Sequence, residues 1–340
     1  MLREALLAWY DANKRDLPWR RTRDPYAVWV SEVMLQQTRV ETVIPYWERF
    51  LARFPSAASL AEASEDEVLA SWSGLGYYRR ARLLHAGVRE VVERYGGEVP
   101  EDPALRRGLP GVGRYTAGAI GSICFDREEP IVDGNVARVL SRAFAIEHPL
   151  GSSASERALW ERAGELVRGE RPGELNQALM ELGARVCTPR SPSCEGCPIA
   201  SWCAARAGDR VGELPVPKKR REPLRVGVVA VVAARADGAV ALARGERALF
   251  GGLYAPPMTE GRGREAALTA LRFARVRARV EAEPAGALEH VLSHRVLDVE
   301  VWRASRPSTR ACRVVAPSEL SALGVSALTR RILAAAQGVG

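Results

Sequence analysis

The chain has 340 residues, too many for one ordinary domain, and its 47% hydrophobic content is ample for buried cores. A formal net charge of +8 and a pI near 9.5 favour a polyanionic partner, most simply nucleic acid, although an arginine-rich proteome would give the same balance. No uninterrupted apolar run is long enough to span a bilayer, so we expect no membrane partner.

The first half of the chain has the apolar periodicity of helices. MLREALLAWYDANKR, at the N-terminus, is a charged amphipathic helix pattern and not a signal peptide, which favours a reducing, cytoplasmic location. From about Ala27 to Val186, apolar residues recur at three- and four-residue steps between Gly and Pro breaks. Nothing in this region alternates as a strand does, so we expect a helical domain over residues 1–207.

The last third of the chain has a different pattern. Residues 208–223, GDRVGELPVPKKRREP, are rich in proline and charge and are interpreted as a linker. Beyond them, PLRVGVVAVVAARADGAVALARGE predicts two strands around an Asp237-Gly238 turn, and LEHVLSHRVLDVEVWRAS predicts another strand pair. EAALTALRFARVR and TRRILAAAQ read as helices. Residues 224–340 should therefore form a small α+β domain.

Two carboxyl residues in the helical region could carry chemistry. Glu32 lies in DPYAVWVSEVMLQQTRV among apolar helical neighbours, which would raise its pKa and suit a general acid, but an exposed helical Glu is the simpler interpretation. Asp133, in IVDGNVARVLSR, stands where a helix should begin. Backbone amides there should keep it ionised, and an anion can stabilise a developing cation.

The stretch GLPGVGRYTAGAI suggests a tight corner between two helices. Gly111 and Gly113 would let this turn approach a ligand, and the free amides of the following helix suit a phosphate. No strand precedes the glycines, which argues against a dinucleotide-binding loop. Taken alone, such a corner is a weak signal.

Four of the six cysteines are clustered with the spacing C-x6-C-x2-C-x5-C, at Cys187, Cys194, Cys197 and Cys203. In a reducing compartment this favours metal over disulfides. Thiolates suit either zinc or an iron–sulfur cluster, and the spacing alone does not choose between them.

Taken together, the cysteine loop, LPGVG, WVSEVMLQQT and VDGNVARVL resemble the MutY-type adenine DNA glycosylases of the helix–hairpin–helix, iron–sulfur superfamily. The resemblance spans nearly the whole chain. It implies a mainly α catalytic region, with a six-helix barrel and a 4Fe–4S cluster on the four cysteines, followed by an α+β Nudix-like domain. It also implies a monomeric, nucleoid-associated enzyme of base excision repair, acting on duplex DNA in which adenine faces 8-oxoguanine or guanine.

The resemblance assigns roles to particular residues. It implies that Glu32 protonates adenine N7 and then positions the attacking water, and that Asp133 stabilises the oxocarbenium-like sugar. Asn135 should hold these two carboxyl groups in position. Endonuclease III-type lyases carry a lysine where this chain has Tyr115. A tyrosine has no amine and cannot form a Schiff base, so the reaction should stop at an abasic site. Tyr115 is expected to assist the carboxylates.

Further positions match the region that holds the extruded base. The residues that match the adenine pocket are Trp19, Arg20, Leu35 and Gln177. The positions that match the DNA-binding or wedge elements are Gln37, Leu75, Tyr77, Gly111 and Gly113. From composition alone, ordinary packing explains the wedge residues about as well.

The C-terminal domain resembles the Nudix-like module with which this family inspects 8-oxoguanine. It lacks the dense glutamate set that a Nudix hydrolase needs to bind magnesium, so we expect a reader and not a hydrolase. Leu292, Ser293 and His294 match the family's Phe-Ser-His loop, with Leu292 in place of the aromatic residue. Two polar side chains thus remain to contact the lesion.

Three other functions fit parts of the sequence. An endonuclease III-like enzyme for oxidised pyrimidines is disfavoured by Tyr115 and the second domain. A non-catalytic iron–sulfur DNA-binding protein, such as a redox sensor, would need neither Glu32 nor Asp133. A Nudix phosphohydrolase fused to a DNA-binding domain would need the missing carboxylates.

Overall fold

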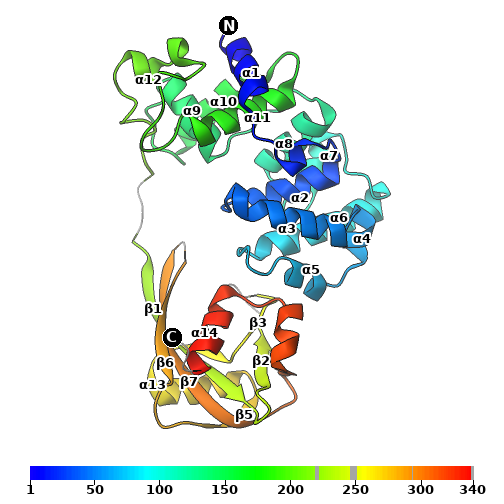
Figure 1. The fold of residues 1–340 in the computed structure, drawn as a ribbon, viewed down its shortest axis with the longest axis vertical. Helices are drawn as coiled ribbons and strands as arrows, with labels where there is room; N and C mark the ends of the chain where they lie inside the picture. Colours follow the sequence, from blue (N-terminus) through cyan, green and yellow to red (C-terminus); the bar gives the residue numbers. More distant parts are fainter. Residues whose placement is uncertain (219–221, 246–250, 293, 338–340) are drawn as a thin grey trace. The chain divides into compact units, whose positions relative to one another are not determined.

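The computed structural model of the chain describes residues 1–218, 222–245, 251–292 and 294–337. The chain divides into two compact units, and the second takes in a short piece of the N-terminal half. The first unit is Met1–Ala61 with Ala86–Arg220, and the second is Glu62–His85 with Arg221–Gly340. Figure 1 labels most of the helices and strands of both units. No helix in the described part of the chain is both long and apolar enough to cross a membrane.

The first unit is helical, which confirms the mainly α fold expected for this region. Its elements are α1 (Leu2–Asn13), η1 (Pro18–Arg20), α2 (Pro25–Leu35), α3 (Val40–Arg53), α4 (Ala57–Glu62), the end of α6 (Arg79–Tyr95), α7 (Pro103–Gly108), α8 (Arg114–Phe125), α9 (Gly134–Ala143), α10 (Ser153–Val167), α11 (Pro172–Arg185), η2 (Ala200–Trp202) and α12 (Ala204–Ala207). Helix α11 packs against α1, α8 and α9, and α2 packs against α3 and α8.

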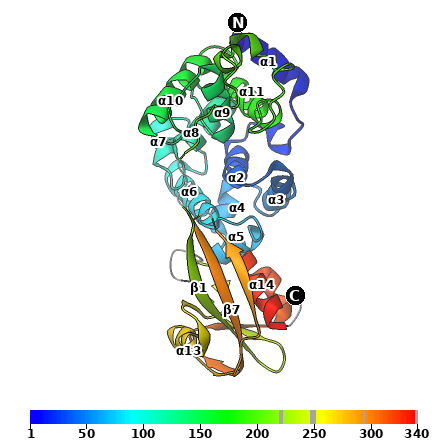
Figure 2. The same cartoon turned by 90° about the vertical axis from the view of Figure 1, so that its left-hand side faces the viewer.

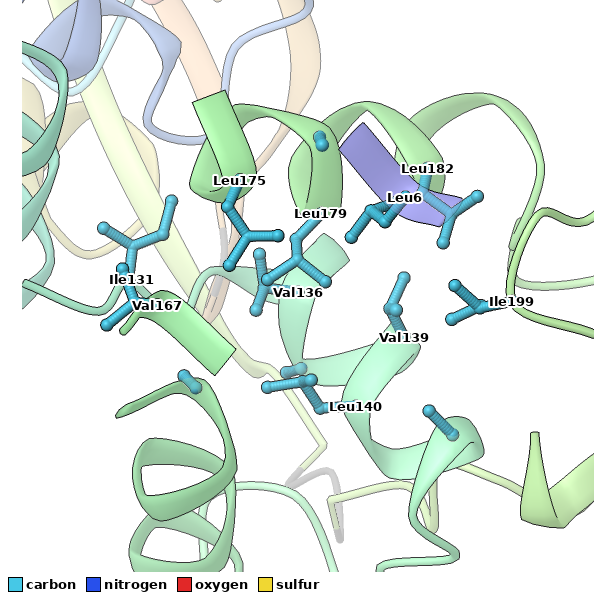
Figure 3. Close-up of a cluster of buried hydrophobic side chains, with 14 of the residues drawn as sticks. Leu6, Ile131, Val136, Val139, Leu140, Val167, Leu175, Leu179, Leu182 and Ile199 are labelled. Carbon is cyan, nitrogen blue, oxygen red and sulfur yellow. The ribbon is translucent and has the colours of Figure 1, made fainter. Parts of the chain in front are cut away.

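An apolar core fixes α9 and α11 against each other (Figure 3). Helix α9 contributes Val136, Val139 and Leu140, at the three- and four-residue steps of one helical face. Helix α11 contributes Leu175, Leu179 and Leu182 in the same way, and these side chains are at most 1% exposed. Because burial of this kind stabilises each leucine by about 1.5–3 kcal/mol, the start of α9 and the adjoining face of α11 are held in place.

The corner between α7 and α8 has the form expected of a helix–hairpin–helix. Leu109 and Val112 are buried and anchor the turn, and Gly111 has a φ of 76°, where a side chain would be strained. Gly113 caps α8, and a Cβ placed there would meet nothing within 4 Å. The free amides at the start of α8 therefore lie beside open space.

The second unit is built on a mixed sheet. Its strands are β1 (Leu224–Ala234), β2 (Val240–Arg244), β3 (Tyr254–Ala255), β4 (Met258–Glu260), β5 (Val276–Val280), β6 (Gly286–Val291), β7 (Arg295–Thr309) and β8 (Arg313–Val315). The main order is β3-β2-β1-β7-β5, and β1 and β7 run parallel along their whole common length. The helical elements are α5 (Glu65–Ser71), the start of α6, α13 (Gly263–Phe273), η3 (Pro317–Ala322) and α14 (Ala327–Gln337).

Alternate residues of the sheet face two separate cores. Val229, Val231 and Trp302 pack with α13, whereas Val228, Ala230 and other residues of β1 and β7 pack with α14. The sheet is thus covered on both faces, as the long apolar run of β1 requires (Figure 2). The expected α+β fold of this region is confirmed.

One expected element is wrong in its extent. The pattern EAALTALRFARVR predicts a helix through Arg277, but α13 ends at Phe273 and Val276–Val280 forms β5. Arg275, with a φ of 54°, breaks the helix, and the alternation of Val276 and Val280 with arginines then pairs with β7. The spacing of apolar residues along the chain carries no information on the pairing of β5 with β7, and this long-range pairing determines the structure here.

Part of the segment expected to be a linker packs on the first unit. Leu214 is 1% exposed and its carbonyl accepts a hydrogen bond from Arg142, and the Val216 carbonyl accepts one from the Leu150 amide. Residues Glu62–His85, in turn, pack within the second unit, where the Tyr78 hydroxyl donates to the Val325 carbonyl at 2.9 Å.

Candidate active site

A cavity of about 560 Å³ in the first unit brings together the residues expected to act on the base. Residues of η1, α2, α8, α9 and α11 line it, and its volume lies in the range of pockets that bind small molecules. The expected residues on its wall are Trp19, Arg20, Glu32, Leu35, Gln37, Tyr115, Asp133, Asn135 and Gln177. These residues span more than 150 positions in sequence, so their meeting is a property of the tertiary fold.

Glu32 is the buried acid of this cavity. It is 4% exposed on α2, and the Tyr115 hydroxyl donates a hydrogen bond to its carboxylate at 2.7 Å. Burial raises the pKa of Glu32 to about 7, with Asp133 adding to the rise, while Tyr115 and Arg20 oppose it. A carboxyl with this pKa holds its proton near neutral pH and can donate it.

Asp133 caps the N-terminus of α9. Its carboxylate accepts from the Val136 amide at 2.7 Å and from the Asn135 side chain at 3.1 Å. Burial raises the pKa of Asp133 above its ordinary value, against the lowering effect of the Val136 and Asn135 hydrogen bonds. The amide hydrogen bonds favour the anion, as expected at a helix start, but burial outweighs them in the direction of the shift.

Asn135 is itself held from two sides. Arg138 donates to its side-chain oxygen at 2.9 Å and to the Gly183 carbonyl at 2.7 Å. A Cβ at Gly183 would stand 2.7 Å from the Cβ of Asn135, so only glycine lets α11 approach α9 this closely. The Asp133–Asn135 pair is thus positioned by α11 as well as by its own helix.

The residues of the expected adenine pocket line the same cavity as the acids. Trp19 is 7% exposed and stacks edge-on against Trp47, with ring centroids 6.1 Å apart. Gln177 accepts a hydrogen bond from the Tyr10 hydroxyl at 3.2 Å, which leaves its amide group free to donate. Leu35 is half-buried and supplies apolar surface.

Sequence reasoning missed Glu181, which is fully buried on α11 and lines the same cavity. It accepts from the guanidinium groups of Arg15 at 2.7 and 2.9 Å and of Arg20 at 2.9 Å. Burial alone would raise the pKa of Glu181, but the two arginines outweigh it and lower the pKa. The available signal was its position: an acid between Ala178 and Leu182 lies on the buried face of α11.

The expected wedge residues fall in both units. Gln37 is exposed at the cavity mouth with a φ of 58°, and Tyr77, in the second unit, is 50% exposed with a φ of 48°. Each side chain is thus presented by a left-handed backbone that non-glycine residues adopt rarely. Leu75 is only 6% exposed, so its side chain supports the turn and is not free to enter a base stack.

The four clustered cysteines line one pocket with Val139, Leu182 and Ile199. Burial raises the pKa of Cys197, and the three other cysteines of the cluster add to the rise. Within the described residues, no three His, Cys, Asp or Glu side chains come close enough to hold a single metal ion. Four thiols around a wider space fit a multi-iron cluster better than one tetrahedral zinc.

Arg142 holds the cysteine loop to α9. It is 3% exposed and donates to the carbonyls of Thr188 and Leu214, each at 2.8 Å, and to the Cys187 sulfur at 3.3 Å. Arg138 adds a hydrogen bond of 2.7 Å to the Cys187 carbonyl. The loop is therefore tied to the helix that begins at Asp133.

The expected lesion-reading loop joins β6 to β7. The Leu292 amide donates to the Arg295 carbonyl at 2.8 Å, and the Leu292 side chain packs partly on the sheet core. His294 is exposed. Ser293 lies outside the described residues.

Three family models match successive parts of the chain. The HhH-GPD superfamily of base excision DNA repair proteins matches residues 30–165, the iron–sulfur binding domain of endonuclease III matches 187–203, and the NUDIX domain matches 228–335. The four cysteines lie within the iron–sulfur match, so the expected 4Fe–4S cofactor is confirmed.

Related proteins match about three fifths of the chain. The chain is 54% identical over 220 residues to the adenine DNA glycosylase of Rattus norvegicus, which covers 62% of this chain and 42% of the rat protein. It is 54% identical over 213 residues to the human adenine DNA glycosylase, a match that covers 60% of this chain and 39% of the human protein. It is 38% identical over 219 residues to the adenine DNA glycosylase of Buchnera aphidicola subsp. Schizaphis graminum, which covers 64% of this chain and 63% of that protein. The chain thus spans less than two thirds of these relatives.

Solved structures give the same fold. A thermostable thymine-DNA glycosylase is 31% identical with a TM-score of 0.54, over 61% of this chain and 95% of the other. A trapped endonuclease III–DNA covalent intermediate, 21% identical with a TM-score of 0.52 over 61% and 94% of the chains, supports the fold alone.

The helical unit with its hairpin, its acid-lined cavity and its iron–sulfur loop defines a class of DNA repair protein, here joined to a Nudix-like domain. Within that class, the chain belongs to the HhH-GPD superfamily of base excision DNA repair proteins.

Proposed function

We propose that the protein is a DNA N-glycosylase that excises adenine mispaired with 8-oxoguanine or guanine and leaves an abasic site. The observation that carries the proposal is Glu32, a buried acid with a pKa of about 7 that shares its cavity with Asp133. The matched adenine DNA glycosylases support the choice of adenine.

In the proposed reaction, the adenine enters the cavity after it leaves the base stack. Trp19 and Leu35 supply apolar surface to the base, and Gln177 and Arg20 supply hydrogen-bond donors to its edge. Glu32 donates its proton to adenine N7, which makes the base a better leaving group. The Glu32 carboxylate that remains accepts a proton from the water that attacks the sugar.

Asp133 faces the positive charge that develops on the sugar as the bond breaks. Asn135 holds its carboxylate in place, and Arg138 holds Asn135. Tyr115 donates to Glu32 and so fixes the direction of the acid. The 4Fe–4S cluster, held by Cys187, Cys194, Cys197 and Cys203, supplies structure to the loop that Arg142 ties to α9.

The proposal includes no strand cleavage. A Schiff base needs an amine at the reacting sugar, and Tyr115 has none. Lys14, the only lysine in residues 1–207, does not line the cavity; its ammonium lies 5.3 Å from the ring centroid of Tyr10. Borohydride should therefore trap no covalent complex with DNA.

The test compares duplexes in which adenine faces 8-oxoguanine, guanine or thymine with duplexes that carry oxidised pyrimidines. Abasic sites are scored with and without alkali. We expect excision of adenine opposite 8-oxoguanine and guanine, visible only after alkali. Glu32→Gln and Asp133→Asn should each lose at least about 100-fold in single-turnover rate while still binding the duplex.

Glu161→Gln, which changes an exposed acid, is the matched control and should retain full activity. Excision of oxidised pyrimidines with strand nicking would support an endonuclease III-like function in its place. Full activity of Glu32→Gln would remove the acid from the mechanism.

A further inference from the structure

The positive charge of the chain is concentrated in its C-terminal part. Residues 221–340 contain 18 arginines, no lysine and 11 acidic residues, a formal charge of +7 out of the +8 of the whole chain. Between residues 262 and 279 there are six arginines against the single acid Glu265. Between residues 301 and 318 there are four arginines and no acid. The helical catalytic region is nearly neutral by comparison.

Six of these arginines form what we call the arginine patch. All six side chains are exposed, and among the described residues none forms an ion pair with a carboxylate. They come from α13, β5, the C-terminal end of β7 and the turns that flank them: Arg264, Arg275, Arg277, Arg279, Arg306 and Arg310.

Other arginines of the same unit are neutralised. Arg225 pairs with both Glu289 and Asp298, at 2.7 and 2.6 Å. Arg244 pairs with Asp66 at 3.0 Å, and further surface arginines of the sheet have acidic partners as well. The six arginines of the patch lack such partners among the described residues, which is the arrangement expected where an external anion supplies the charge.

The patch follows an edge of the sheet. Strand β5 is the terminal strand in the order β3-β2-β1-β7-β5, and Arg277 and Arg279 pair with Ser308 and Ser305 of β7. The register shifts between these two pairs, and Arg306 there has a φ of 52°. A bulge of this kind re-aims side chains at a sheet edge.

A hollow of about 690 Å³ opens within the patch. Arg264 and Arg279 line it, together with Ser305 and the carboxylate of Glu281. Two guanidinium groups against one carboxylate leave an excess of positive charge, and serine adds a neutral donor. The wall thus suits phosphate oxygens more than an apolar ligand.

The patch is far from the loop expected to read the lesion. Residues 292–294 precede Arg295 at the start of β7, whereas Arg306 lies near its end. At about 3.3 Å per residue, the two sites are roughly 35 Å apart along the strand. Figure 2 shows the length of β7 and the position of α13 beside one end of it.

We propose that the arginine patch is a second DNA-binding surface, separate from the 292–294 loop, that holds the phosphate backbone of undamaged duplex. Arg277 and Arg279, two residues apart on a strand, lie roughly 6.6 Å from each other. Two guanidinium groups this close together can contact phosphates of one DNA strand at the same time. Contacts of this kind position DNA without reading its sequence.

The experiment measures binding of the full chain to an undamaged duplex of about 60 base pairs across a range of salt concentrations. The variant Arg277→Gln/Arg279→Gln removes two charges of the patch. We expect the slope of log affinity against log salt to fall in magnitude by about 2, since each phosphate contact contributes about 0.9. Affinity at low salt should fall at least about tenfold.

Arg330→Gln/Arg331→Gln is the matched control. It removes the same charge from exposed arginines of α14, a helix that packs on the other face of the sheet from α13. The control should keep the wild-type slope. Equal losses in the two variants would reduce the effect to net charge and overturn the proposal, as would a patch variant with an unchanged slope.

Two further measurements separate this proposal from others. Adenine excision on a duplex of about 20 base pairs should be the same in both variants, because none of the substituted arginines lines the cavity or belongs to the 292–294 loop. A loss of binding to poly-glutamate, with duplex binding unchanged, would assign the patch to an acidic protein partner and overturn our proposal.

Discussion

At the scale of single residues, the chemistry depends on where the proton of Glu32 resides. Burial places its pKa near 7, and the Tyr115 hydrogen bond holds that value down because it favours the charged form. Two opposing effects on one carboxyl can be separated by substitution.

Tyr115→Phe should raise the pKa of Glu32 above about 7, because the hydrogen bond that favours the anion is lost. The protonated acid then persists to higher pH. We expect the alkaline limb of the single-turnover excision rate to move up by roughly one pH unit. Tyr26→Phe, which removes a buried hydroxyl that donates to the Phe54 carbonyl, should leave the limb in place. A limb that moves to lower pH would contradict the assigned direction.

Glu32→Gln should stabilise the protein at alkaline pH. The folded pKa of about 7 lies above the ordinary value of 4.5, so the native state holds a proton that the unfolded state releases between these pH values. Wild-type stability therefore falls as pH rises through this window, by up to about 3 kcal/mol, and the Gln variant avoids the fall. Thermal melts from pH 4 to pH 9 test this, with Glu161→Gln as the exposed control. Parallel curves for wild type and Glu32→Gln would refute it.

Glu181→Gln should be strongly destabilising. Its carboxylate neutralises Arg15 and Arg20, and removing one partner of a buried pair costs about 3–5 kcal/mol. Because Arg20 lines the cavity, the variant should also bind the extruded base less tightly, which would raise KM more than it lowers kcat. Asp16→Asn breaks an exposed pair with Arg21 and should change neither quantity. Equal melting temperatures for Glu181→Gln and Asp16→Asn would show that the ion pairs of Glu181 do not stabilise this wall of the cavity.

At the scale of elements, α9 connects two parts of the first unit. Its start carries Asp133 and Asn135, while its body carries Arg138 and Arg142, which bind the cysteine loop. The helix is held by the leucine and valine core that it shares with α11. A substitution that loosens the cysteine loop is therefore expected to displace Asp133 and Asn135 as well, because α9 connects the two as a rigid element.

Arg142→Lys should loosen the iron–sulfur loop. One ammonium group is unable to reach the several carbonyls and the Cys187 sulfur that the planar guanidinium spans. We expect less iron per chain and weaker visible absorbance, with faster loss of iron to a chelator. Arg206→Lys serves as the control, because Arg206 lines the same pocket but is exposed. Equal iron content in the two variants would show that Arg142 does not hold the loop.

At the scale of the whole molecule, catalysis and charge are divided between different parts of the chain. The cavity belongs to the first unit, and nearly all of the net positive charge belongs to residues 221–340. We propose that the base opposite adenine is recognised by residues 292–294, which belong to the second unit and not to the catalytic unit.

The variant Ser293→Ala/His294→Ala tests this division. It should narrow the ratio of excision rates between adenine opposite 8-oxoguanine and adenine opposite guanine, because two polar groups that could contact the lesion are lost. The ratio should narrow by about tenfold. Ser305→Ala/Ser308→Ala, toward the opposite end of β7, should preserve it. An unchanged ratio in both variants would take the loop out of lesion recognition.

Local features of the sequence predicted much of the fold. The spacing of Cys187 to Cys203, the helix start at Asp133 and the strand turn at Asp237-Gly238 depend on neighbouring residues, and each appears in the structure. The end of α13 was missed because pairing between β5 and β7 is a long-range interaction. Local spacing carries no information about such a partner.

The amino-acid sequence by itself determined the two kinds of domain and the cysteine ligands, because periodicity, turns and ligand spacing are encoded over a few residues. Only the tertiary structure decided that Glu32 is buried against Tyr115 and that Glu181 neutralises Arg15 and Arg20. It also decided that the six arginines of the patch have no carboxylate partner within the part of the chain that the structure describes. Burial and pairing depend on residues far apart in the chain, and they set the protonation and charge on which function depends.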